Sequence, residues 1–197
     1  MKSIAEMSSL ELAAYVCDSL KQKGILTTLS GGFCTEIYSC GAYTSMDIDL
    51  INQYNEDHKK IVSIMLELGF KQEGRYFYHE DATYAIEFPS GPPAVGDEII
   101  KNVAEIDTEA GVLRILTPTD AIKDRLAAYY FWKSERTLDQ ALWIAEKNEF
   151  DMNNIEEWSN REGMSEKFSE FKSQYFKILE TKISVFLPND PNAIIPS

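Results

Sequence analysis

Two aspartates stand one residue apart in the apolar stretch "MDIDLIN". This stretch predicts a β-strand, and because successive side chains of a strand point to opposite faces, Asp47 and Asp49 should project from one face. The other face should carry apolar side chains into the core: Met46, Ile48 and Leu50. Two neighbouring carboxylates repel each other and lose hydration when buried, and a shared divalent cation removes both penalties. The aspartate pair therefore predicts a site for Mg²⁺ or Mn²⁺.

A pair of glycines precedes this strand, between a predicted strand that ends at Ser30 and a predicted helix. Glycine lets the backbone approach a phosphate closely, and a helix N-terminus offers free N–H groups and a positive dipole end. The Ser30 hydroxyl adds a further polar group. Ser30, Gly31 and Gly32 are therefore predicted to bind the phosphates of a nucleotide. Taken alone, a glycine pair is most often a simple turn, and an Asp-x-Asp strand is most often a solvated face.

The order and spacing of these features resemble the signature of the nucleotidyltransferase superfamily: a hydrophobic residue, Gly-Gly or Gly-Ser, a helix, then Asp-hydrophobic-Asp-hydrophobic. The resemblance implies metal-dependent transfer of a nucleotidyl group from an NTP to a hydroxyl acceptor, with Asp47 and Asp49 as catalytic metal ligands. It also implies a third carboxylate on a later strand. Glu87 in "YAIEF" is the favoured candidate, either as a metal ligand or as the base for the acceptor hydroxyl, and Asp107 and Asp81 are the alternatives.

More narrowly, the chain resembles minimal nucleotidyltransferases akin to the AbiEii-type toxins of type IV toxin–antitoxin systems. Three stretches carry this resemblance: "SGG…SMDIDL", "FPSGPPAVGDE" and "LTPTDAIKDRLAAYYFW". It implies an RNA acceptor, an antitoxin protein as partner, and Ser45 and Lys123 as further nucleotide-binding residues. Surface pairing with Asp120 is the alternative for Lys123. Those toxins often carry Arg shortly before the aspartates, and Tyr43 occupies that position here. The alternative function is a weak or inactive nucleotide-binding module that acts through a protein partner.

The residue periodicities predict an α+β fold in which a nucleotidyltransferase-like mixed β-sheet with flanking helices is followed by a C-terminal helical bundle. The predicted parts are an α/β domain, a helical domain and an extended tail: residues 1–116, 117–185 and 186–197. The proline- and glycine-rich residues 88–98 are expected to form a loop. The aromatic residues 129–132 are expected to pack inside the protein.

Composition limits the other classes of function. The chain has 197 residues and a net charge of −13, so most of its surface should repel nucleic acid, and RNA would need a local basic patch. No apolar run approaches the roughly 18 residues of a membrane span. Three cysteines without a CxxC pair favour a reduced, cytoplasmic protein. Two histidines without zinc-ligand spacing, and the lack of Walker and GxGxxG motifs, argue against zinc hydrolase, P-loop and Rossmann chemistry.

Overall fold

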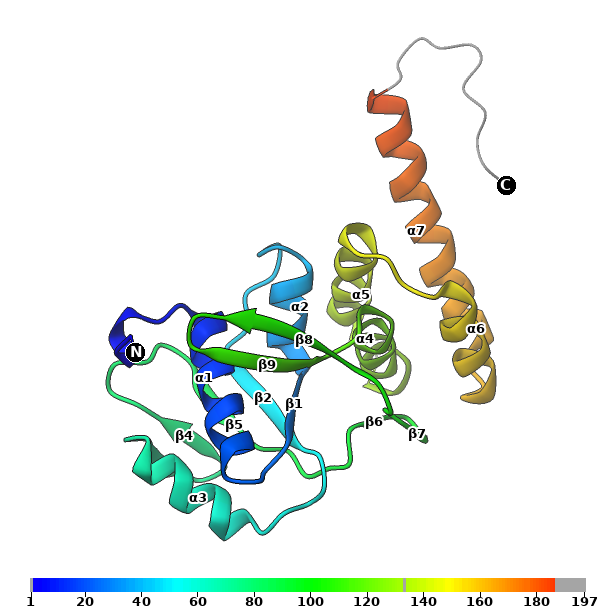
Figure 1. Cartoon of the computed structure of the whole chain (residues 1–197). Coiled ribbons are helices and arrows are strands. Elements are labelled where there is room, and N and C mark those ends of the chain that lie inside the picture. The colour runs from blue at the N-terminus through cyan, green and yellow to red at the C-terminus, as the bar shows by residue number, and fades with distance from the viewer. Residues whose placement is uncertain (1, 133, 187–197) are drawn as a thin grey trace.

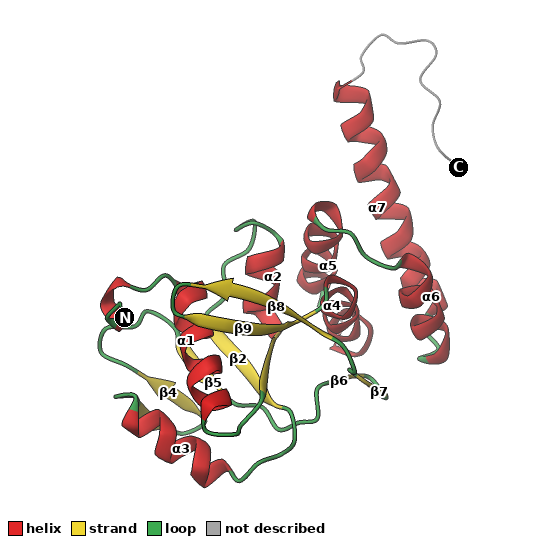
Figure 2. Ribbon diagram, viewed as in Figure 1, coloured by secondary structure: helices red, strands yellow, loops and turns green. Residues whose placement is uncertain are grey.

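A seven-stranded mixed β-sheet organises the first part of the chain (Figures 1 and 2). The computed structural model describes residues 2–132 and 134–186. The strands lie side by side in the order β3-β4-β5-β2-β1-β9-β8. Their bounds are β1 Thr27–Ser30, β2 Asp47–Asn52, β3 Lys71–Glu73, β4 Tyr76–Tyr78, β5 Ala85–Glu87, β8 Val103–Thr108 and β9 Gly111–Leu116. A separate two-stranded ribbon consists of β6 Ala94–Val95 and β7 Glu98–Ile99.

The strand pairing at the centre of the sheet sets the positions of the polar residues. Strand β2 runs antiparallel to β1 and parallel to β5. In this register Asp49 lies opposite Ser30 on one side and opposite Glu87 on the other. Directly opposite residues on neighbouring strands project from the same face of a sheet. Ser30, Asp49 and Glu87 therefore form one row across three adjacent strands.

Helices cover the sheet and form the C-terminal part of the described chain. Their bounds are α1 Ser9–Gln22, α2 Gly31–Tyr38, α3 His58–Glu67, α4 Pro118–Trp132, α5 Glu135–Lys147, α6 Met152–Arg161 and α7 Ser165–Phe186, with a short 3-10 helix at Ile4–Glu6. Helix α1 packs on β9, β8 and β1, whereas α2 packs on β2 and β1 and also contacts α4 and α5. Helix α7 extends away from the sheet (Figure 1).

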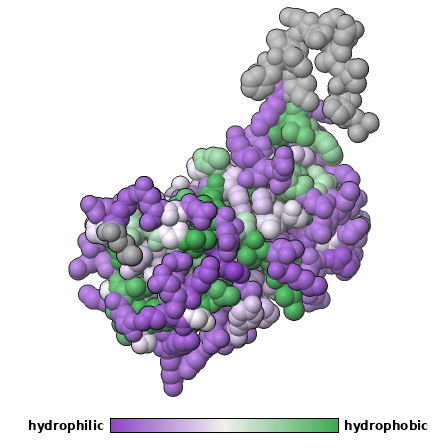
Figure 3. Space-filling model, viewed as in Figure 1, coloured by the Kyte–Doolittle hydropathy of each residue, from purple (hydrophilic) through white to green (hydrophobic). Residues whose placement is uncertain are grey.

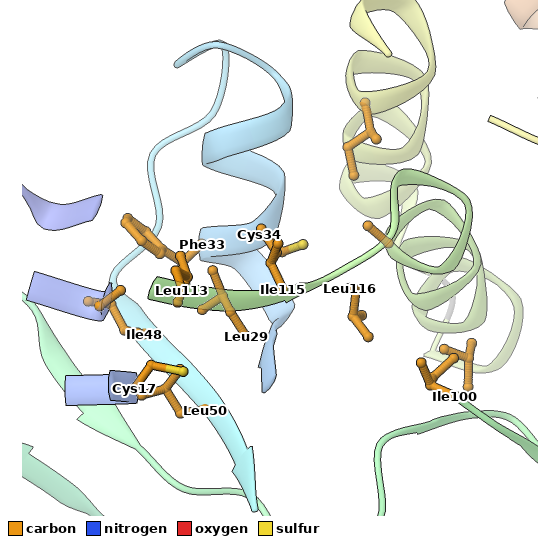
Figure 4. Packing of buried hydrophobic residues seen from close by; sticks show 14 of the residues in the cluster. Cys17, Leu29, Phe33, Cys34, Ile48, Leu50, Ile100, Leu113, Ile115 and Leu116 are labelled. Atoms are coloured by element: carbon orange, nitrogen blue, oxygen red, sulfur yellow. The ribbon is translucent and has the colours of Figure 1, made fainter. Parts of the chain in front are cut away.

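The core continues from the sheet into the helices. Leu29 of β1 and Ile115 of β9 lie close to Phe33 and Cys34 of α2 (Figure 4), and all four side chains are buried. The same hydrophobic cluster includes residues of the later helices, among them Leu126, Trp158 and Phe171. Strand β9 ends at the predicted boundary near residue 116, but the division into two domains stays a prediction because one cluster joins the two parts.

The predicted fold class, a mixed sheet with flanking helices followed by a helical region, is confirmed. Several local predictions are wrong. Met46 precedes β2 and is 86% exposed, so it does not enter the core with Ile48. The β6–β7 ribbon begins within the predicted loop 88–98 and ends one residue beyond it, at Ile99. Helix α7 runs through Phe186, the first residue of the predicted tail 186–197, and residues 187–197 lie outside the described residues.

Hydrophilic side chains cover most of the face seen in Figure 3, with small hydrophobic patches between them. Two of the four aromatic residues predicted to be internal contribute to the exposed surface. Tyr129 and Tyr130 are buried, but Phe131 and Trp132, at the end of α4, are exposed. Among the described residues, no helix is both long enough and apolar enough to span a bilayer.

Candidate metal and nucleotide site

Three carboxylates meet at the centre of the sheet: Asp47 and Asp49 of β2 and Glu87 of β5, together called the acidic triad. One carboxylate oxygen from each lies within 4.8 Å of the others, and all three residues are half-buried. The oxygen ligands of one Mg²⁺ lie about 3–4 Å apart, because each Mg–O distance is about 2.1 Å. Small rotations of the carboxylates would bring the three oxygens into that range. The donor set, oxygen only and negatively charged, fits Mg²⁺ or Mn²⁺.

The electrostatics of the triad favour a cation. Burial is the main reason why the pKa of Asp49 is raised to about 7, the nearby charges of Asp47 and Glu87 contribute to the rise, and Arg125 acts in the opposite direction. Without a cation the third negative charge is therefore hard to form at neutral pH. A divalent ion bound by the triad would remove this penalty.

The glycine pair allows α2 to begin directly against the carboxylate strand. A β-carbon at Gly31 would lie 2.1 Å from Asp49 Oδ2, and Gly31 has φ +70°, a conformation that L-residues rarely adopt. A β-carbon at Gly32 would lie 2.7 Å from Ser45 Oγ. At either position an added β-carbon would displace a neighbouring side chain, Asp49 or Ser45. The N-terminus of α2, with its free N–H groups, consequently lies beside the acidic triad.

Ser30 is the N-cap residue of α2, but its side chain makes no capping hydrogen bond. The residue is buried and lies opposite Asp49 in the strand pairing. Its hydroxyl is therefore placed beside the triad and is not used by the helix that it precedes. This position suits the predicted contact with a phosphate oxygen.

Ser45 is placed differently, because it already has partners in the protein. Its hydroxyl donates to the Asp47 carbonyl oxygen at 3.0 Å, and its N–H donates to Glu36 Oε2 at 2.7 Å. The Tyr84 hydroxyl also donates to the Glu36 carboxylate, at 3.1 Å. These contacts fix the residues that lead into β2. Ser45 thus lies next to Gly32 and the start of the carboxylate strand.

Lys123 lies outside the acidic triad in an ion-paired position. Its side chain is 1% exposed, and its Nζ donates to Glu98 Oε1 at 2.9 Å and lies 3.6 Å from Asp120 Oδ1. Glu98 also pairs with Arg161 of α6, and the Lys123 hydrogen bond is the main reason why the Glu98 pKa is lowered. Lys123 lines a polar hollow of about 370 Å³ near the start of α4. Its nucleotide-binding role stays a prediction.

Arg125, two residues further along α4, is the arginine whose charge acts on Asp49. Its guanidinium donates to Asp124 Oδ2 through Nε and Nη2, and to Gln140 Oε1 through Nη1 at 3.2 Å. Residues two apart on a helix do not share a face, so Lys123 and Arg125 contact different parts of the protein. The sequence places both cations in the first turns of the predicted helix but does not indicate which part of the protein each side chain contacts.

A second arginine contacts the triad from the β3–β4 turn. Arg75 Nε lies 3.4 Å from Glu87 Oε2, and its side chain is 69% exposed. No sequence pattern marks Arg75, because the strand pairing that brings it to Glu87 joins separate segments. The alternative third carboxylates, Asp81 and Asp107, are exposed residues outside the cluster.

Comparisons with known proteins give weak similarity. No protein-family model matches the chain, and no curated protein matches it. The crystal structure of ANT(2'')-Ia in complex with adenylyl-2''-tobramycin is similar over 80% of this chain and 92% of that one, with a TM-score of 0.41 and 15% identity. The solution structure of the antibiotic-resistance factor ANT(2'')-Ia is similar over 85% and 93%, with a TM-score of 0.40 and 14% identity. This similarity is too weak to assign the activity of ANT(2'')-Ia to the present chain.

Proposed function

We propose that the protein transfers a nucleotidyl group from a nucleoside triphosphate to a hydroxyl acceptor, with Mg²⁺ or Mn²⁺ bound by Asp47, Asp49 and Glu87. One observation carries the proposal: Gly31, at the start of α2, abuts Asp49 of the acidic triad. The glycine turn, which is suited to phosphates, therefore lies directly beside the acidic triad, which is suited to a divalent cation. A metal-bound triphosphate needs both together.

In the proposed reaction the acceptor oxygen attacks the α-phosphorus of the NTP. The bond between that phosphorus and the oxygen that bridges the α- and β-phosphates breaks, so that pyrophosphate leaves. Phosphoryl chemistry of this kind depends mainly on positioning and on neutralising charge. A bound divalent ion would supply much of that neutralisation. The N–H groups at Gly31 and Gly32 and the Ser30 hydroxyl would hold phosphate oxygens, and Arg125 would add positive charge near Asp49.

Glu87 has two compatible roles, as third metal ligand or as the base that accepts the proton of the acceptor hydroxyl. Its position is compatible with both roles, because it lies at one end of the row formed with Asp49 and Ser30. Glu87→Gln separates the roles. Loss of Mn²⁺ affinity indicates a ligand, whereas retained affinity with loss of turnover indicates the base.

The finer points of the function rest on the sequence resemblance. They are an RNA acceptor and a toxin role with an antitoxin partner, whereas a cytoplasmic location rests on the three cysteines that form no CxxC pair. The net charge of −13 limits an RNA acceptor to a local patch.

The test uses the full chain with Mn²⁺ and NTPs labelled at the α- or γ-phosphate. We expect binding of metal–NTP by the wild type, and at least about 100-fold weaker binding of the metal by Asp47→Asn/Asp49→Asn. We expect the α-label, and not the γ-label, to reach a hydroxyl acceptor when the protein is incubated with RNA, with cell extract or with small polyols including tobramycin. Asp107→Asn is the matched control because it removes an exposed carboxylate outside the triad.

Absence of metal–NTP binding in the wild type would overturn the proposal. Transfer of the γ-label would also overturn it, because the reaction would then be phosphorylation. Metal–NTP binding that needs the triad, without transfer to any acceptor, would favour the inactive nucleotide-binding module instead.

A further inference from the structure

An aromatic pair lies next to the glycine turn on the side of α5. A β-carbon at Gly32 would lie 3.3 Å from both Cε1 and Oη of Tyr43, so the Tyr43 ring borders the N-terminus of α2. The ring stacks with Trp143 of α5, with centroids 6.5 Å apart and an angle of 28° between the planes. Both aromatic residues are half-buried. The two stacked rings therefore lie beside the predicted phosphate-binding turn and support each other there.

A guanidinium group lies over the Tyr43 ring. Arg136 Cζ is 5.4 Å from the centroid of the Tyr43 ring, within the range of a cation–π contact. Arg136 is exposed, and within the described part of the chain no carboxylate lies within ion-pair distance of it. Arg125 differs, since Asp124 already occupies its Nε and Nη2 donors. The five N–H donors of Arg136 thus remain available to an anion.

One face of α5 connects this arginine to the triad. Arg136, Gln140 and Trp143 stand at positions i, i+4 and i+7, which share one helix face. Gln140 accepts a hydrogen bond from Arg125, the arginine that acts on Asp49, and Trp143 stacks on Tyr43, the neighbour of Gly32. The face therefore contacts two residues that neighbour the predicted site: Arg125, whose charge acts on Asp49, and Tyr43, which lies beside Gly32.

We infer that Arg136 is a phosphate-binding residue that contacts the β- and γ-phosphates of the bound triphosphate, and that Tyr43 and Trp143 position its guanidinium. The inference rests on the proposed function and assigns the terminal phosphates to one named cation. A bidentate guanidinium contact to phosphate is among the stronger polar interactions in proteins. The contact with Arg136 also predicts that the protein discriminates between nucleotides by the number of their phosphates. A nucleoside monophosphate lacks the β- and γ-phosphates and would not contact Arg136.

The experiment compares the affinities of NTP, NDP and NMP for the full chain with Mn²⁺. Arg136→Ala should weaken NTP binding about 10- to 100-fold and leave NMP binding within about twofold. Arg136→Lys should recover part of the loss. Lys177→Ala is the matched control, because it removes one exposed positive charge on α7, away from the sheet. It should leave all three affinities unchanged.

Three further variants test the positioning role. Tyr43→Phe keeps the ring and should behave as wild type, whereas Tyr43→Ala should weaken NTP binding but leave Mn²⁺ affinity unchanged. Placing a guanidinium beside Gly32, as Tyr43→Arg in the Arg136→Ala background, should restore NTP binding. Equal NTP affinity of Arg136→Ala and Lys177→Ala would overturn the inference while leaving the proposed function intact. A wild type that binds no NTP would overturn both.

Discussion

Gly31 and Asp49 are packed so closely that a β-carbon at Gly31 would lie 2.1 Å from Asp49 Oδ2 and 3.1 Å from its Cγ. The two residues come from different elements, the first turn of α2 and the centre of β2. The helix N-terminus and the carboxylate can approach this closely only because residue 31 has no side chain. The placement of the acidic triad therefore depends on a glycine that cannot itself bind a metal.

Gly31→Ala should displace the Asp49 carboxylate and lower Mn²⁺ affinity about 10- to 100-fold, as the loss of a supporting residue in a metal site typically does. Gly41→Ala separates the steric effect from backbone strain. Gly41 also has positive φ, +81°, but nothing lies within 4 Å of its added β-carbon. Both variants should lose about 1–2 kcal/mol of folding free energy through the backbone conformation. Isothermal titration with Mn²⁺ should reveal the difference, and equal affinities would contradict the steric argument.

The raised pKa of Asp49 predicts how the stability of the metal-free protein changes with pH. Between pH 4 and its folded-state pKa of about 7, folded Asp49 holds a proton that the unfolded chain releases. Stability should therefore fall as the pH rises through this window. Asp49→Asn removes the effect and should stabilise the metal-free protein at pH 8 by on the order of 2–4 kcal/mol. Urea denaturation with EDTA at pH 5, 6, 7 and 8 measures this, and Asp107→Asn, as control, should retain the slope.

Arg75 should compete with the proposed metal ion for Glu87, because its Nε lies 3.4 Å from the carboxylate. Arg75→Ala should raise Mn²⁺ affinity by up to about fivefold, the limit set by a weak exposed ion pair. The gain should shrink at high salt, since exposed charges are screened. Lys71→Ala removes an exposed positive charge from the same hairpin and should have no effect. A lower Mn²⁺ affinity for Arg75→Ala would show that the arginine helps to organise the triad.

Lys123 and Arg125 should respond differently to substitution by Met. Lys123→Met leaves Glu98 and Asp120 without their buried partner and should destabilise the protein by about 3 kcal/mol. If Lys123 only pairs with these carboxylates, the NTP affinity should stay within about twofold of wild type, whereas the nucleotide-binding role predicts a larger loss of NTP affinity. Arg125→Met should weaken NTP binding, because the cation that acts on Asp49 is lost. Thermal denaturation and NTP titration give the two readouts. Lost NTP affinity with unchanged stability in Lys123→Met would instead favour the role predicted from the sequence.

Local patterns were sufficient for the parts of the site that lie within one element. The alternation in "MDIDL" predicted that Ile48 and Leu50 are buried and that the aspartates share the other face, as observed. The same alternation failed at Met46. Strand pairing begins at Asp47, opposite Ala85 of β5, and Met46 precedes the strand. The first paired residue depends on the partner strand, which the periodicity of one segment does not contain.

The remaining parts of the site depend on contacts between distant segments. Glu87 joins Asp49 through the β2–β5 register, so spacing along the chain could select it but not place it. The orientation of α4 about its own axis decides whether Lys123 or Arg125 lies near the triad. This orientation is set by the buried residues of α4, which pack against the sheet and α5. Arg136 reaches Tyr43 only because α5 packs against α2. No pattern within α5 indicates that contact.

The strict alternation of β2 also has a consequence for the kinds of sequence change that the protein can accept. Inserting or deleting one residue between Asp47 and Leu50 would exchange the two faces of the remaining strand. A carboxylate would then enter the core, and an apolar side chain would take its place beside Gly31. Point substitutions at 48 and 50 that keep an apolar side chain leave this arrangement unchanged. Related chains with the same chemistry should therefore differ in length in the connecting loops, such as residues 53–57, and never within this strand.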